Sequence, residues 1–122
     1  ASGGNNLARY ITKTVELADD ADVITAFLAV NRPSASNVEL YYRVLTSGSA
    51  ASMVDTTWVL ATPTASISIN DNPGIFEEVQ YDLDPLGAGV SFGSMQFKIV
   101  MRSTNTSDIP KIQQLRAIAL QA

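Results

Sequence analysis

The stretch "DIPKIQQLRAIALQA", residues 108–122, decides the fold, because it can form either a helix or a strand. Most of its residues are good helix formers, and a helix would present one apolar stripe: Ile112, Leu115, Ile118 and Ala119. A strand would instead place alternate residues on one side: Leu115, Ala117 and Ala119. Ile112 joins that side only if a bulge near 113–114 shifts the register.

The sequence before this tail favours the strand. Residues 94–103, "SMQFKIVMRS", alternate clearly, with these side chains inward: Met95, Phe97, Ile99 and Met101. The polar turn 104–110 then delivers the tail antiparallel alongside this strand. Because tertiary context often overrides helix propensity, we expect the tail to be a strand that neighbours residues 94–103.

The rest of the chain consists of short β-prone runs separated by polar turns. The run "VITAFLAV" (23–30) is apolar on both faces, which predicts a central strand covered on both sides. In 37–46 the inward side chains are Val38, Leu40, Tyr42 and Val44. The predicted strands are 9–17, 23–30, 37–46, 57–61, 65–69, 75–83, 94–103 and the tail. About eight strands without a long helical pattern predict an antiparallel β-sandwich or jelly roll.

Two details concern individual strands. In 9–17 we expect Ile11, Val15 and Leu17 on one side, and "ADDAD" (18–22) should interrupt the strand. In 75–83 the residues expected on one face are Ile75, Val79, Tyr81 and Leu83.

Length and composition predict one domain with an uncharged surface. The chain has 122 residues, near the commonest domain size, and we expect a flexible leader at 1–7 and a single β-sandwich domain at 8–122. Charged residues make up 16%, against about a quarter in typical soluble domains. A surface rich in Ser, Thr, Asn, Gln and Ala suits permanent contact with neighbouring subunits, and it also fits a small secreted domain.

The charge pattern and the missing residue types exclude several functions. The net charge is −4 and the eight basic residues are scattered singly, so neither nucleic acid nor an anionic membrane is an expected partner. The chain has no His and no Cys, which removes the usual general base and the standard hydrolytic triad. We therefore expect no enzymatic activity. No apolar run reaches transmembrane length.

Four residues are candidate contacts with a protein partner or a glycan: Tyr41, Arg43, Trp58 and Arg32. Tyr41 and Arg43 alternate away from the inward side of their strand, whereas Tyr42 is expected in the core. Trp58 follows a long loop and fits either the core or a binding platform. Arg116, flanked by apolar residues, should lie in solvent or at an interface, or else be buried against a carboxylate of Glu16, Asp19, Asp20 or Asp22.

No cofactor is expected. Calcium is an alternative, since it takes six to eight oxygen ligands and carboxylates gather at Asp19, Asp20, Asp22 and Asp71. These residues lack the spacing of an EF-hand, and aspartates are also common in turns. Glu77 and Glu78 are adjacent in a predicted strand, so they point to opposite faces and cannot form a glycosidase pair with each other.

Several blocks, in this order, resemble a known module: "ARYITKTVELAD", "NRPSASNVELYYRVL", "TTWVL", "FEEVQYDL" and "MQFKIVMRSTNTSDIPKIQQLRAIAL". They are similar to a module of structural proteins of tailed bacteriophages, especially tail, baseplate and fibre-associated proteins of large myophages. The resemblance covers nearly the whole chain beyond the leader. It implies a galactose-binding-like (discoidin-type) β-sandwich in which the C-terminal block is an edge-to-centre strand, and it supplies no catalytic residues.

The expected function follows from this resemblance and from the composition. We expect a non-enzymatic module made in the host cytoplasm and located in the virion, where it assembles with other virion structural proteins. It should form a homo-oligomer or part of a symmetric assembly. The alternative is a carbohydrate-binding module for receptor recognition. A third possibility, a glycosidase, would need two carboxylates facing each other across a cleft.

Overall fold

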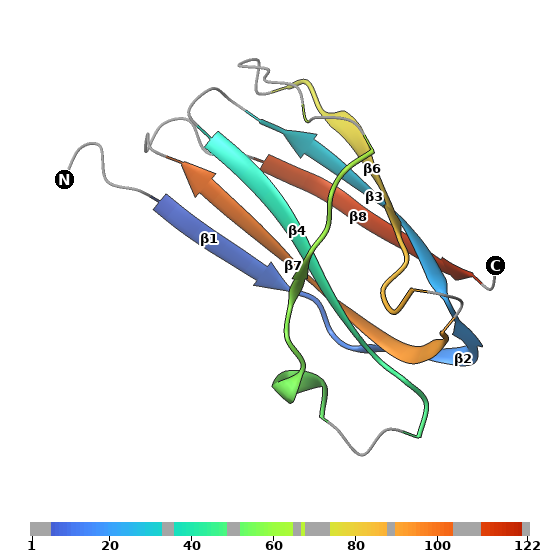
Figure 1. The fold of residues 1–122 in the computed structure, drawn as a ribbon. Coiled ribbons are helices and arrows are strands. Elements are labelled where there is room, and N and C mark those ends of the chain that lie inside the picture. Colours follow the sequence, from blue (N-terminus) through green and yellow to red (C-terminus); the bar gives the residue numbers. More distant parts are fainter. Residues whose placement is uncertain are drawn as a thin grey trace.

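The computed structural model describes residues 6–32, 36–48, 52–64, 67, 74–87, 90–103 and 111–120, without the side chains of residues 6–8, 111 and 113. Eight strands make up most of this part of the chain. They are β1 (Asn6–Ile11), β2 (Val15–Ala21), β3 (Val23–Asn31), β4 (Ser36–Leu45), β5 (Val59–Leu60), β6 (Glu77–Leu83), β7 (Phe92–Ser103) and β8 (Lys111–Leu120). A single 3-10 turn, η1 (Met53–Asp55), precedes β5. The predicted antiparallel β-sandwich of about eight strands is confirmed (Figure 1).

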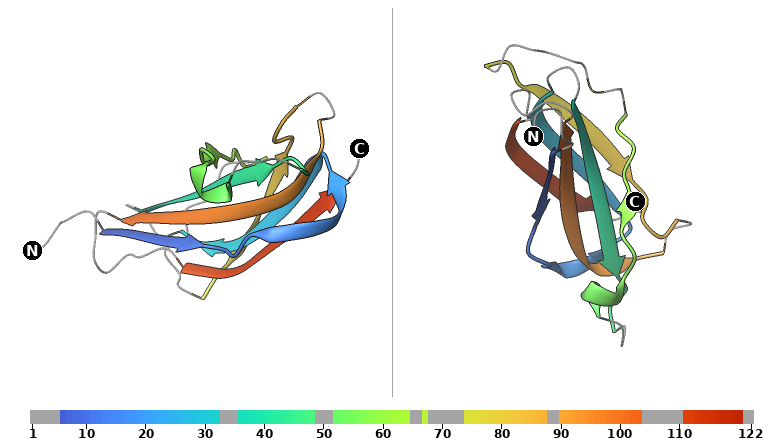
Figure 2. Two further views of the ribbon diagram at one scale, coloured as in Figure 1. Left: turned by 90° about the horizontal axis from the view of Figure 1, so that it is seen from below. Right: turned by 90° about the vertical axis from the view of Figure 1, so that its left-hand side faces the viewer.

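The strands form two sheets that lie as two layers (Figure 2). The five-stranded sheet has the order β1-β7-β4-β5, and β2 pairs with the same edge of β7 as β1 does. The three-stranded sheet has the order β6-β3-β8. The chain changes sheet after β2, β3, β5, β6 and β7, so most strand pairs join segments far apart in sequence.

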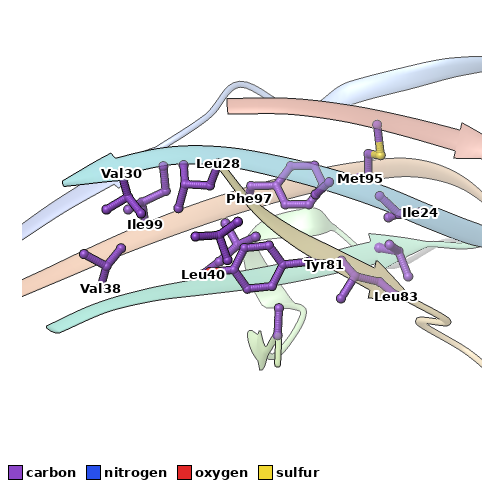
Figure 3. Packing of buried hydrophobic residues seen from close by; sticks show 14 of the residues in the cluster. Ile24, Leu28, Val30, Val38, Leu40, Tyr81, Leu83, Met95, Phe97 and Ile99 are labelled. Atoms are coloured by element: carbon purple, nitrogen blue, oxygen red, sulfur yellow. The ribbon is translucent and has the colours of Figure 1, made fainter. Parts of the chain in front are cut away.

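The core lies between the sheets, where the inward residues of four long strands meet (Figure 3). Alternation along each strand supplies them, as expected for a sheet with one buried face. They include Ile24 and Leu28 of β3, Leu40 of β4, Tyr81 of β6, and Phe97 and Ile99 of β7, all at most 3% exposed. Each such side chain contributes roughly 1.5–3 kcal/mol by its burial.

The tail is a strand, as predicted, but its neighbour is different. β8 pairs antiparallel with β3 of the three-stranded sheet and not with β7. The edges of β7 are already taken, one by β1 and β2 and the other by β4. Between β7 and β8 the chain therefore passes to the other sheet.

The bulge that Ile112 needs in order to share a side with Leu115 is present in the tail. Ala29 pairs with Gln114 and the next residue, Val30, pairs with Ile112, so residue 113 is the extra residue. The shift places Ile112 with Leu115 against the core, together with Ala117 and Ala119.

The first predicted strand, 9–17, is divided into β1 and β2. Ile11 pairs with Lys98 and Val15 with Met95, so a step of four residues here matches three on β7. This irregularity turns Ile11 to the outer face, where it is 52% exposed, so the predicted shared side of Ile11 and Val15 is wrong.

Other boundaries also differ from the expectation. β2 continues through "ADDAD" as far as Ala21, because this segment keeps an antiparallel pairing with β7, and β1 begins at Asn6, inside the predicted leader. The predicted strand 57–61 shrinks to β5, and the predicted strand 65–69 falls, apart from residue 67, outside the described residues.

Two exposures also differ from the predicted pattern. The outer face of β3, formed by Val23, Thr25, Phe27 and Ala29, is half-buried, because no third layer covers it within the described part of the chain. Ile75, expected inward, lies before β6 begins and is 49% exposed.

Candidate functional site

The outer face of the five-stranded sheet brings three of the four predicted contact residues together. β4 and β7 pair so that Tyr41 is opposite Lys98 and Arg43 is opposite Gln96. Trp58 immediately precedes β5, which pairs with β4 through Tyr41 and Tyr42, and so it reaches the same face. We call Tyr41, Arg43, Trp58 and Lys98 the aromatic–cation cluster.

Arg43 is the anchor of this cluster, and it is only 9% exposed. Its Nε donates to Oε1 of Gln96 at 2.8 Å, and its Nη1 donates to the carbonyl of Thr56 at 3.2 Å. The guanidinium carbon lies 4.0 Å from the ring centroid of Trp58. Such a cation–π contact is worth up to about 2 kcal/mol when desolvated. Arg43 therefore ties the loop before β5 to the sheet.

Lys98 completes the cluster, and the sequence did not single it out. Its Nζ lies 4.7 Å from the ring centroid of Tyr41 and 4.9 Å from that of Trp58. The outward alternation of 94–103 was visible in the sequence, but the ring neighbours depend on the register between β4 and β7. Lys98, Tyr41 and Trp58 are all half-buried residues, so their ammonium group and rings could contact an anionic or flat ligand.

A polar network borders the cluster at Glu39. This carboxylate accepts hydrogen bonds from the Tyr41 hydroxyl at 3.3 Å and from Nε of Arg102 at 3.0 Å. The hydrogen bond to Glu39 raises the pKa of the Arg102 guanidinium above its ordinary value. The Tyr41 hydroxyl is therefore already engaged within the chain.

Arg32, the fourth predicted contact residue, binds backbone carbonyls rather than joining the cluster. It follows β3 and donates from Nε to the carbonyl of Ser36 and from Nη1 to the carbonyl of Ile67, both at 2.9 Å. It lines a hollow of about 320 Å³ together with Leu60 and Tyr81. Its bonds hold the segment after β5 against the end of β3.

The acidic residues do not gather into a metal site in the described part of the chain. Asp19 and Asp20 belong to β2, Asp22 follows it, and Asp20 accepts a hydrogen bond from Ser47. Asp71 lies outside the described residues. Among the described residues, no group of three or more acidic side chains is placed to hold a cation.

The outer face of the three-stranded sheet is more open. Arg116 of β8 leans across Phe27 of β3, with its guanidinium carbon 5.1 Å from the ring centroid, and its Nη2 lies 2.6 Å from Oε2 of Glu78 on β6. Its side chain is 52% exposed, which agrees with the predicted solvent or interface position. Its carboxylate partner is Glu78 and none of the four carboxylates considered from the sequence. Beside it, Ile118 and Leu120 are 51% and 49% exposed.

Two tyrosines have clear environmental effects on their pKa values: Tyr81, which is buried, and Tyr42, which is half-buried. Burial raises the pKa of Tyr81 to about 12. Burial, and then the nearby charge of Asp84, raise the pKa of Tyr42 above its ordinary value. Both groups stay protonated at neutral pH.

No protein-family model matches this chain, and neither a curated protein nor a solved structure matches it. Among the described residues, no helix has the length and apolar character needed to cross a bilayer.

Proposed function

We propose that this chain is a non-enzymatic structural module of a tailed-bacteriophage virion that acts by assembling with other virion proteins. The resemblance of its sequence blocks to tail, baseplate and fibre-associated proteins supports the phage setting. A rigid two-layer sandwich with 16% charged residues suits a role in which much of the surface is in contact with other subunits.

The observation that carries the proposal is the apolar outer surface at β8. Ile118 and Leu120 are about half exposed, and each continues a cross-strand row onto β3, opposite Thr25 and Val23. A contiguous exposed apolar surface marks an interaction site more often than isolated exposed residues do. The ion pair between Arg116 and Glu78 on this face would lie at the rim of such an interface.

The proposal is tested on the particle itself. Phage particles from the source of the gene are purified on a density gradient, and the chain is quantified by mass spectrometry against a known virion protein. We expect a fixed copy number per particle that survives a high-salt wash. Absence of the chain from particles that contain the other structural proteins would contradict the proposal.

The second candidate function, carbohydrate binding, has one observation in its favour. Tyr41 and Trp58 lie on one face and are both half-buried, so each leaves part of its ring accessible. Against it, both rings already pack on cations of the same chain. The test is a glycan array probed with the wild type, with Trp58→Ala, and with Arg116→Ala as a control on the opposite face. A signal lost only in Trp58→Ala would favour glycan binding over assembly.

A further inference from the structure

The edges of the two sheets are protected very unequally. An open strand edge exposes unpaired backbone N–H and C=O groups, and natural sheets protect such edges by short strands, charges, bulges or a covering segment. At the β6 edge, the backbone N–H of Thr64 donates to the carbonyl of Gln80 at 2.9 Å, so a neighbouring segment covers part of it. β5, the edge opposite β1 in the five-stranded sheet, has only two residues.

The edge formed by β1 and β2 carries two kinds of protection. It is interrupted between Ile11 and Val15 by the register shift described above. Exposed charged residues follow its length: Arg9, Lys13, Glu16 and Asp19. Pairing with another strand would require these charges to lose water and a second strand to match an irregular edge.

Within the described part of the chain, β8 lacks comparable protection over most of its length. It is ten residues long, and its bulge at residue 113 leaves the stretch 114–120 regular. This stretch contains no proline and one charge, Arg116. That charge is turned away from the open edge, because it leans across Phe27 to Glu78 on the far strand of the sheet. No described strand pairs with the outer edge of β8.

We propose that two copies of this chain pair antiparallel along β8, so that the two three-stranded sheets join into one continuous sheet across a two-fold axis. The pairing deepens the proposed function, because it names a second copy of the chain as one assembly partner. Backbone hydrogen bonds would supply the contact, as in strand addition to an open edge. A two-fold contact of this kind is self-complementary and closes at two subunits.

The sequence of β8 selects the register. In an antiparallel pair, two directly opposed residues point to the same face of the sheet. The two-fold axis must therefore pass through a residue position, because an axis between two residues would oppose side chains that point to opposite faces. An axis at Arg116 would oppose two guanidinium groups, which is unfavourable. An axis at Ala117, the centre of the regular stretch 114–120, opposes Arg116 to Ile118 of the other copy and Leu115 to Ala119 of the other copy. The inner apolar row then continues through the dimer.

Sedimentation equilibrium tests whether the copies pair. We expect a monomer–dimer equilibrium for the wild type, and a dissociation constant raised about tenfold or more by Ile118→Lys, which opposes a second cation to Arg116 of the other copy. Ile118→Glu should weaken the dimer less. Ile11→Lys is the matched control, since Ile11 is 52% exposed on another edge and also lies beside a cation, Lys98. A wild-type monomer, or equal effects of Ile118→Lys and Ile11→Lys, would overturn the pairing.

Cysteine cross-linking tests the register, and the chain offers a clean background because it has no cysteine. Ala117→Cys should form an interchain disulfide on mild oxidation, because opposed residues at the axis have Cα atoms about 4.5–5.5 Å apart, within the disulfide range. Ala119→Cys is the matched control: both alanines belong to the inner row, but residue 119 of the two copies would be about 14 Å apart. Cross-linking through 119 and not 117, or through neither, would overturn the register.

The β8 pairing and the virion role can be contradicted independently of each other. A monomer that is nevertheless found at fixed copy number in phage particles would remove the β8 pairing and leave the virion role. A dimer that cross-links through Ala117→Cys but is absent from particles would keep the pairing and remove the virion role.

Discussion

The two outer faces of this sandwich differ in how far their side chains are satisfied within the chain. On the five-stranded face, Arg43 is 9% exposed and is held by Gln96, the Thr56 carbonyl and the Trp58 ring. On the three-stranded face, Ile118 and Leu120 are about half exposed beside one open ion pair. Both faces carry an arginine beside an aromatic ring, but only on the five-stranded face is the arginine buried and bound to its own loop, whereas the three-stranded face leaves aliphatic side chains exposed.

The largest expected effect is a difference in stability between arginine substitutions on the two faces. Arg43→Ala should lower the free energy of unfolding by about 3 kcal/mol, because it removes the charged hydrogen bonds of a buried guanidinium to half-buried Gln96 and Thr56, together with its contact with the Trp58 ring. Arg116→Ala, on the other face, should cost at most about 1 kcal/mol, because both members of its ion pair are more than half exposed. Urea denaturation of the two variants measures both values. Equal losses would show that the two faces do not differ in this way.

Burial of inner side chains such as Tyr81 should stabilise the three-stranded sheet more than contacts on its outer face do. The stability at alkaline pH tests the contribution of Tyr81. The pKa of Tyr81 is raised from 10.0 to about 12 by burial, so the folded state favours the protonated phenol. The stabilisation that protonated Tyr81 adds to the free energy of unfolding is fully present below about pH 10. It is lost as the pH rises through about 12, and the total loss is roughly 2–3 kcal/mol. Urea denaturation between about pH 8 and pH 12 measures the slope.

Tyr81→Phe should remove most of that slope, because it removes the buried group that titrates. The remaining slope should come from Tyr42, whose pKa is also raised. Tyr10→Phe is the matched control, because it removes the same hydroxyl from a side chain that is 61% exposed. An unchanged slope in Tyr81→Phe would contradict the assignment to Tyr81.

Each face also contains one arginine–aromatic pair, and double-mutant cycles compare them. Arg43 lies 4.0 Å from the Trp58 ring centroid and is buried, so the coupling energy of the pair should be about 1–2 kcal/mol. Arg116 and Phe27 are 5.1 Å apart with the arginine exposed, so their coupling should be about 0.5 kcal/mol or less. A larger coupling for the second pair would reverse the ranking of the two faces.

The smallest effect concerns the bulge at the start of β8. Deleting one of the two adjacent glutamines, 113 or 114, leaves the sequence Ile-Gln-Leu, in which the alternation is regular and Ile112 and Leu115 still share the inner side. The free energy of unfolding should therefore change by less than about 1 kcal/mol. Deleting Ala117 instead should cost much more, because it moves the flanking residues to opposite faces. Thermal unfolding followed by circular dichroism compares the two deletions.

The candidate site was predictable in part. The alternation of 37–46 placed Tyr41 and Arg43 on the outer side, and the structure agrees. Their meeting with Trp58 and Lys98 could not be predicted, because it requires the register of β4 on β7 and the return of the chain into β5. Arg32 was predicted as a contact residue too, but it donates to the carbonyls of Ser36 and Ile67. These partners also depend on the tertiary structure and could not be predicted.

For β3, β4, β6 and β7 the sequence by itself determined most of the inward-facing residues, because alternation at a period of two is a local property. It also determined that Ile112 could join Leu115 only through a bulge. Only the tertiary structure decided that β8 pairs with β3, since β7 has two edges and other strands occupy both. Which side chains are left exposed depends on that choice of partner, and a partner far away in the chain leaves no periodic signal in the sequence.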